Sequence, residues 1–187
     1  MNGNYNLTSK DELTTLVKSN GIISWNQLTE FIKKLPYGRT KNRKDFKLVI
    51  SEKKGTCSSK HALLKKIADL NNISNIKLVL GIFRMNQLNT PKIGNELTGY
   101  SLEYIPEAHC YLKINDKRID LTSHKSDFTK IEKDIIQEKE IEPEQVSEFK
   151  VEYHKNFIKQ WIIENDVEFD FNQIWDIREK CIKNLTE

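Results

Sequence analysis

Cys57 stands where a helix is expected to begin, directly after Gly55-Thr56. A cysteine attacks a carbonyl carbon as the thiolate, and the dipole and unpaired N–H groups at a helix N-terminus lower a thiol pKa. Gly55 leaves room for backbone or substrate to come close, and Ser58 and Ser59 are alternative caps for the helix. The motif therefore predicts a nucleophilic cysteine. The competing interpretation is a buried core cysteine, the usual fate of a single Cys.

A histidine and an aspartate lie in two segments that flank Asn115-Asp116, a pair typical of a two-residue hairpin turn. In that register one face of the hairpin is polar and the other is almost purely apolar, as a half-buried hairpin requires. His109 and Asp120 are then diagonal neighbours on the polar face, with Cβ atoms about 7–8 Å apart or somewhat less. An Asp there fixes the imidazole tautomer and favours its protonated form. The alternative is an ordinary exposed polar pair.

The other two cysteines do not belong to this polar face. The same register turns Cys110 toward the apolar face, and Cys181 lies on an apolar helical stripe, so we expect both in the core.

Three cysteines without a CxxC spacing argue against a disulfide framework and for a reduced compartment. The first residues have neither a basic nor an apolar leader region. We therefore expect a cytoplasmic protein.

Further elements must position these residues. Ser9–Glu12 and Ser24–Gln27 have the form of capping boxes that open amphipathic helices. Apolar residues at helical spacing follow Cys57, and a β-rich run begins at Lys77. In chain order we expect a helix from Ser9 to Asn20, a helix from Ser24 to Pro36, a basic loop over 37–47, a short strand over 46–50, a helix over 57–70, an interior strand over 77–85, a long loop over 86–105, hairpin strands over 107–114 and 117–122, and C-terminal helices.

Taken together, the motifs resemble the transglutaminase-like superfamily. In that superfamily Gly-x-Cys opens a helix and a strand follows, then a His on one strand and an Asp on the next. The matching segments here are Gly55-Thr56-Cys57, 78–83, Ala108-His109-Cys110-Tyr111 and Ile119-Asp120-Leu121-Thr122. The resemblance covers about residues 46–123. It implies that Cys57 is the nucleophile, His109 the general base and Asp120 the acid that orients the histidine.

The resemblance also implies the fold. We expect an α+β protein with a transglutaminase-like or papain-like core, in which the nucleophile helix packs on an antiparallel sheet. Helical extensions over 7–36 and 143–187 would complete a single domain, 1–187. The departures from the family pattern are His61 where Ala is frequent, Leu121 in place of the Pro of Asp-Pro-Thr, and Cys110 where an aromatic residue often follows the His.

The superfamily includes protein cross-linking enzymes, deamidases, peptidases and deglycosylating amidases. We therefore expect a cysteine-dependent acyl-transfer enzyme that acts on an amide or ester bond through a thioester. Hydrolysis, as in a protease, amidase or deamidase, is favoured over transamidation. The substrate would be a peptide, a protein or a small amide, and we expect no cofactor.

Four residues are candidates for contacts with the substrate. Gln27 and Asn42 have side chains that can donate to an oxyanion, and residue type is the only ground for naming them. Arg39 and Arg43 lie upstream of Cys57 and can recognise an acidic group or a carboxylate. The alternative is that the two arginines form a solvated loop face.

Two other functions remain open. The chain can be a non-catalytic transglutaminase-like domain that binds or acts as a scaffold, or Cys57, His61, His109 and Cys110 can bind zinc. The hairpin register argues against zinc, because His109 and Cys110 face opposite ways.

The net charge is +3 with the two signs interspersed, which does not indicate nucleic acid. No apolar stretch has the length of a membrane span, so we expect no membrane partner.

Overall fold

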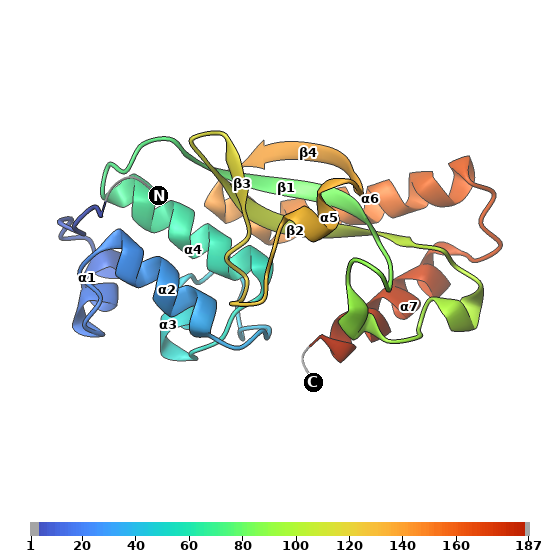
Figure 1. Cartoon of the computed structure of the whole chain (residues 1–187), viewed down its shortest axis with the longest axis horizontal. Coiled ribbons are helices and arrows are strands. Elements are labelled where there is room, and N and C mark those ends of the chain that lie inside the picture. The colour runs from blue at the N-terminus through green and yellow to red at the C-terminus, as the bar shows by residue number, and fades with distance from the viewer. Residues whose placement is uncertain (1–3, 186–187) are drawn as a thin grey trace.

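A four-stranded antiparallel sheet in the order β3-β2-β1-β4 is the centre of the protein (Figure 1). The computed structural model describes residues 4–185 and has an α+β fold. Strands β1 (Ile76–Met85) and β2 (Ile105–Ile114) pair along their full length. The shorter strands β3 (Lys117–Ile119) and β4 (Ile135–Ile141) form the two edges.

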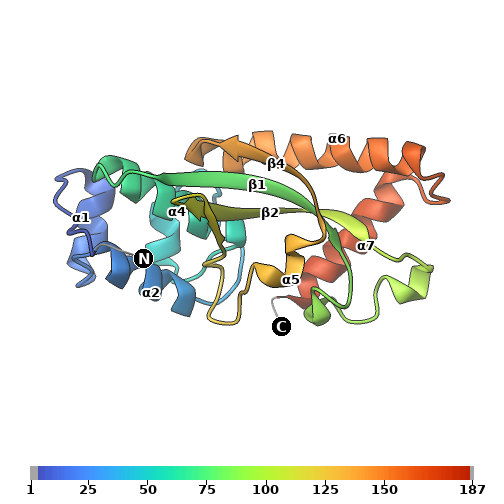
Figure 2. The ribbon, with the colours of Figure 1, turned by 45° about the horizontal axis from the view of Figure 1, so that its top comes forward.

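The helices gather at the two ends of this sheet. Figures 1 and 2 show the N-terminal helices α1 to α4 at one end and α6 and α7 toward the other. The α-helices are α1 (Glu12–Ser19), α2 (Trp25–Lys34), α3 (Lys47–Ser51), α4 (Cys57–Leu70), α5 (Thr129–Glu132), α6 (Glu148–Glu164) and α7 (Phe171–Asn184), with 3-10 turns at Pro91–Ile93, Thr98–Tyr100 and Pro143–Val146. None of the helices within residues 4–185 is long and apolar enough to span a membrane.

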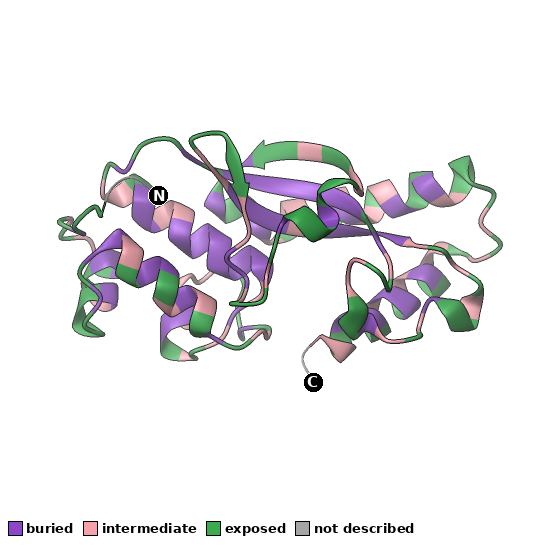
Figure 3. Cartoon of the chain, in the orientation of Figure 1, coloured by how far each residue is buried: buried purple, intermediate pink, exposed green. Residues whose placement is uncertain are grey.

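Each face of the sheet belongs to its own hydrophobic cluster, and buried residues run along β1, β2 and α4 (Figure 3). Leu80 on one face packs in the same cluster as Leu64 of α4. Val79 and Tyr111 on the other face join a cluster that includes Ile174 of α7. A strand buried on both faces needs a nearly continuous apolar sequence, which β1 has. Each large side chain buried in this way contributes roughly 1.5–3 kcal/mol.

The hairpin has the predicted register. Ile114 pairs with Lys117 and Leu112 with Ile119, and both turn residues, Asn115 and Asp116, have positive φ. The ladder between β2 and β3 ends at Ile119, sooner than predicted, while β2 continues to Ile105. Over residues 105–111, the part of the chain described here has no strand paired with the outer edge of β2.

The prediction of a strand over residues 46–50 is wrong. This segment is helix α3, which buries Val49 and Ile50. The side chain of Asp45 accepts a hydrogen bond from the Lys47 N–H at 3.0 Å and turns the chain into a helical conformation. A five-residue apolar run has no periodicity that separates strand from helix.

Two helix caps also differ from prediction. Asp11, rather than Ser9, caps α1 by accepting a hydrogen bond from the Thr14 N–H. Thr56, rather than Ser58 or Ser59, is the N-cap of α4. The Ser24 capping box of α2 is confirmed.

Strand β4 lies in a charged stretch for which the sequence predicted no element. Its residues alternate between charged and apolar types too weakly to identify a strand, as is common at sheet edges. Glu138 of β4 accepts hydrogen bonds from side chains on β2 and β3, namely Tyr111, Lys113 and Arg118. These contacts hold a polar strand against the sheet.

Candidate active site

Cys57 is the first residue of α4, as predicted. In the capping box, the Thr56 hydroxyl accepts from the Ser59 N–H, and the Ser59 hydroxyl accepts from the Thr56 N–H at 3.0 Å. The N–H groups of Cys57 and Ser58 have no acceptor within the helix, as is general for a first helical turn. The thiol therefore lies at a helix N-terminus where two backbone N–H groups can donate to a ligand.

The segment before Cys57 is fixed by a short parallel contact with residues 36–38. Gly38 donates to the Gly55 carbonyl at 3.3 Å, and Gly55 donates to the Pro36 carbonyl at 3.2 Å. This contact brings Tyr37 beside the start of α4. Sequence reasoning treated Tyr37 as part of a polar loop and missed this position.

The space at Gly55 is filled by Lys60. A Cβ atom at Gly55 would lie 2.8 Å from Lys60 Cγ. The fully buried Lys60 donates from Nζ to the Leu35 and Thr122 carbonyls, each at 2.6 Å. Burial lowers the pKa of Lys60 to about 8, against the opposing effect of Asp120. Gly55 thus accommodates a buried lysine, and the predicted room for substrate at this glycine is absent.

His109 and Asp120 form the predicted pair. His109 Nε2 lies 3.0 Å from Asp120 Oδ2. The other ring nitrogen, Nδ1, is the one left to act on Cys57. Asp120 is itself held in place, because its Oδ1 accepts from the Thr122 N–H at 2.8 Å. The structure thus places Asp120 in contact with His109, and His109 interacts in turn with Cys57.

Charge interactions in this group favour an ion pair. Burial alone would raise the pKa of Cys57, but the charges of Lys150 and His109 outweigh it and lower the pKa to about 6. Burial would lower the pKa of His109, but Asp120 and the Cys57 thiolate raise it well above its ordinary value. Burial would raise the pKa of Asp120, but His109 brings it well below its usual range. At neutral pH the group therefore holds a thiolate, an imidazolium and a carboxylate.

His61 joins the two halves of the triad. Its Nδ1 lies 2.7 Å from the Cys57 carbonyl oxygen, and its Nε2 accepts from the Leu121 N–H at 2.8 Å. The ring therefore carries its proton on Nδ1 and is neutral, and burial lowers its pKa to about 4. Through these two contacts His61 connects the start of α4, which carries Cys57, to the segment that carries Asp120.

Lys150 and Ser58 extend the site in a way the sequence did not indicate. Lys150 of α6 donates to the Ser58 hydroxyl at 2.6 Å, and that hydroxyl lies 3.8 Å from the Cys57 sulfur. Lys150, which lies in the predicted C-terminal helical extension, thus places a positive charge near the Cys57 sulfur. No local signal could have identified Lys150, which lies among many other charged residues 92 positions from Ser58.

A cavity of about 290 Å³ opens beside Cys57, between the start of α4 and the helices α6 and α7. Its lining comprises Tyr37, Arg39, Arg43, Thr56, Cys57, Ser58, Glu107, Lys150, Val151, His154, Lys155, Trp175, Arg178, Glu179 and Ile182. Burial raises the pKa of Tyr37, and Cys57 and Glu107 raise it further. Its hydroxyl is therefore a neutral hydrogen-bond donor next to the nucleophile.

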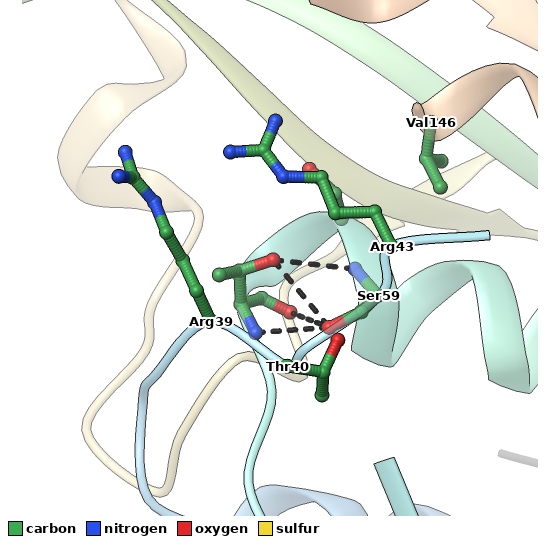
Figure 4. A pocket seen from close by; sticks show the side chains of 7 residues that line it. Arg39, Thr40, Arg43, Ser59 and Val146 are labelled. Carbon is green, nitrogen blue, oxygen red and sulfur yellow. Dashed lines mark hydrogen bonds between the residues drawn. The ribbon is translucent and has the colours of Figure 1, made fainter. Parts of the chain in front are cut away.

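Two of the four substrate-contact candidates line this cavity and two do not. Arg39 and Arg43 are exposed and lie at the cavity, and Figure 4 shows Arg43 beside Ser59 and Arg39 on the other side of the hydrogen-bonded capping box. Gln27 is occupied in the capping box of α2, where its Oε1 accepts from the Ile23 and Ser24 N–H groups. Asn42 is exposed and accepts from a backbone N–H in its own turn. The structure gives Gln27 and Asn42 no place at the cavity.

Cys110 and Cys181 are fully buried, as predicted. Burial raises the pKa of both thiols, that of Cys181 to about 11. Within residues 4–185, no group of three or more His, Cys, Asp or Glu side chains is arranged to hold a metal ion.

The three cysteines should differ sharply in reactivity. We expect iodoacetamide to alkylate Cys57 with a rate that rises through half its maximum near pH 6, because the reactive thiolate forms as the pH rises through that pKa. Cys110 and Cys181 should stay nearly unreactive up to pH 8. Peptide mapping by mass spectrometry after timed alkylation would measure this. Equal and slow alkylation of all three would contradict the ion pair.

Compared with protein-family models, with curated proteins and with solved structures, the chain gives no match in any of the three comparisons.

Proposed function

We propose that this protein is a cysteine-dependent acyl-transfer enzyme with a transglutaminase-like or papain-like core. The observation that carries the proposal is the 3.0 Å contact between His109 and Asp120 next to a helix-terminal Cys57 with a lowered pKa. An oriented imidazole beside a thiolate is what nucleophilic attack on an amide or ester carbonyl requires. The packing of α4 against β1 and β2 supports the assignment of the core.

In the first step the Cys57 sulfur forms a bond to the carbonyl carbon of the substrate. The imidazolium of His109 gives its proton to the leaving nitrogen or oxygen as the bond from that atom to the carbonyl carbon breaks. The products are a thioester on Cys57 and a free amine, ammonia or alcohol. Asp120 holds the ring so that its Nδ1 faces the reacting atoms.

Negative charge that develops on the carbonyl oxygen needs donors. The N–H groups of Cys57 and Ser58 are available at the first turn of α4. The Tyr37 hydroxyl lines the same cavity and stays protonated because burial raises its pKa. We assign these groups the role for which the sequence offered Gln27 and Asn42.

In the second step neutral His109 takes a proton from water. The hydroxide attacks the thioester, the bond between sulfur and carbon breaks, and a carboxylic acid leaves. The Cys57 thiolate and the His109 imidazolium are restored. An amine in place of water would give transamidation; hydrolysis remains the favoured outcome.

A chromogenic ester tests the proposal. With 4-nitrophenyl acetate we expect a burst of nitrophenolate close to one equivalent of protein, and an acetyl group on Cys57 by peptide mass spectrometry. Cys57→Ala should abolish the burst, whereas Cys181→Ala, which removes a thiol outside the site, should retain it. Adding a primary amine would show whether acyl transfer competes with hydrolysis.

A different pattern of acetylation would contradict the proposal. Acetylation spread over lysines without a burst, from a protein that is folded, would exclude the thioester route. It would favour the alternative of a non-catalytic binding or scaffold domain.

A further inference from the structure

Positive charge exceeds negative charge in the cavity beside Cys57. Its lining holds five basic side chains against two carboxylates, Glu107 and Glu179. The basic side chains are Arg39, Arg43, Lys150, Lys155 and Arg178. The Cys57 thiolate, the His109 imidazolium and the Asp120 carboxylate together carry one negative charge, so a positive excess remains available to a ligand.

The two carboxylates are already used by two of the arginines. Arg178 donates to both oxygens of Glu107, at 2.6 and 2.7 Å, and to Glu179 at 2.5 Å. Arg39 donates to Glu179 as well, at 2.8 Å. Lys155 pairs with Glu152, which lies outside the lining.

Arg43 and Lys150 are the two basic side chains of the lining that are left without a carboxylate partner among the described residues. Within residues 4–185 neither has a carboxylate at ion-pair distance, and Lys150 donates instead to the Ser58 hydroxyl. Arg43 is exposed but partly desolvated by the protein around it, which lowers its pKa, and the nearby charges of Arg39 and Arg178 lower it further. These guanidinium groups repel one another, and a bound anion would relieve the repulsion.

The free N–H groups of α4 add to this positive potential. Figure 4 shows the side chains of Arg39 and Arg43 extending in a similar direction from their loop, next to the capping box at the start of α4. A helix N-terminus favours anions, and a guanidinium group matches the geometry of a carboxylate or phosphate. At about 290 Å³ the cavity is at the lower end of the ~300–1,000 Å³ common for small-ligand pockets.

We propose that the acyl substrate carries an anionic group, a carboxylate or a phosphate, which Arg43 and Lys150 bind beside the carbonyl that Cys57 attacks. This inference rests on the proposed acyl-transfer function and names its substrate class. The size of the cavity favours a small compound or the end of a longer chain over an internal segment of a folded protein.

A pair of alkylating reagents tests the inference without a known substrate. Iodoacetate and iodoacetamide both react when the thiolate displaces iodide, and they differ in that iodoacetate carries a carboxylate. The readout is the ratio of the two rates at Cys57, divided by the same ratio for glutathione. We expect this normalised ratio to exceed one by roughly three- to tenfold.

Two variants locate the effect. Arg43→Gln should lower the normalised ratio by roughly threefold or more. Lys41→Gln removes one charge from the same exposed loop outside the cavity, and it should leave the ratio unchanged. A normalised ratio of one in the unaltered protein, or equal ratios in the two variants, would overturn the inference.

Protection of the unaltered protein gives a second measurement and separates the two anions. Succinate or inorganic phosphate should slow alkylation of Cys57 by iodoacetamide more than potassium chloride does at the same ionic strength. Protection by succinate identifies a carboxylate site, and protection by phosphate a phosphate site. Slowing no greater than that by potassium chloride would overturn the inference.

These experiments test the anionic substrate class separately from the proposed acyl-transfer function. If Cys57 forms the acetyl-enzyme but shows no preference for iodoacetate, only the anion site is wrong. If Cys57 does not react with iodoacetamide near pH 6 and forms no acetyl-enzyme, the proposed function itself is wrong.

Discussion

His109→Ala should slow the alkylation of Cys57 by iodoacetamide at pH 6 by up to about twentyfold. Without the imidazolium the pKa of Cys57 would return from about 6 toward its ordinary value of 9.0. A complete return would lower the thiolate fraction at pH 6 roughly 500-fold, and Lys150, which is still present, keeps the fall below this limit. The more basic thiolate is intrinsically more reactive, which offsets about 20- to 30-fold of that loss. The smaller thiolate fraction and the higher reactivity of the thiolate together give the expected slowing of alkylation.

The measurement needs a matched control and a check of folding. His124→Ala removes an exposed histidine and should leave the rate at Cys57 unchanged. An unfolded variant would alkylate all three cysteines alike, so the rate ratio of Cys57 to Cys181 separates loss of the ion pair from loss of structure. A rate at Cys57 that does not change in folded His109→Ala would mean that His109 does not sustain the thiolate.

Glu107→Gln should destabilise the protein by about 3–5 kcal/mol. Glu107 and Arg178 are only 6 % and 8 % exposed, and two hydrogen bonds join them. Without the carboxylate the buried guanidinium still has Glu179 as an ion-pair partner and lies over the Trp175 ring, so we expect a value near the lower end. Urea unfolding followed by circular dichroism would measure the change.

An exposed ion pair provides the control. Glu148 is 80 % exposed and pairs with Lys44, so Glu148→Gln should cost less than about 1 kcal/mol. If both variants lost the same stability, the buried pair would have no special role. Glu107→Gln combined with Arg178→Met should recover part of the loss, because no unpaired charge is then buried.

The same pair predicts a dependence on pH. Burial would raise the pKa of Glu107, but Arg178 and His154 lower it from 4.5 to about 2 in the folded protein. A carboxylate with a lowered pKa binds protons more weakly when folded, so its stabilisation is complete above about pH 4.5 and is lost as the pH falls through about 2. The stability difference between the unaltered protein and Glu107→Gln should therefore shrink over that range.

Much of the site could be predicted because its signals are local. The Asn115-Asp116 turn and the alternation around it fix the hairpin register, and that register brings His109 close to Asp120. The start of α4 follows from the apolar spacing after Cys57. The class of the fold, α+β with an antiparallel sheet, follows from these elements together.

Most of what could not be predicted depends on contacts between distant parts of the chain, and helix α3 is an exception. Residues 46–50 form a helix because of a turn at Asp45 and not because of their own apolar pattern. Strand β4 is stable because Glu138 meets donors on β2 and β3, which its own sequence does not reveal. Lys150 reaches the nucleophile from another helix, and Tyr37 reaches it through the contact with Gly55.

The contribution of Lys150 to the ionisation of Cys57 has a consequence for biosynthesis. A ribosome working at about 5–20 residues per second needs roughly 5–20 s to travel the 92 positions from Ser58 to Lys150. During that time the nascent chain contains the cysteine but lacks Lys150, one of the cations that lower its pKa. The thiol is therefore less ionised and reacts more slowly with oxidants and stray electrophiles until α6 has been made and has docked.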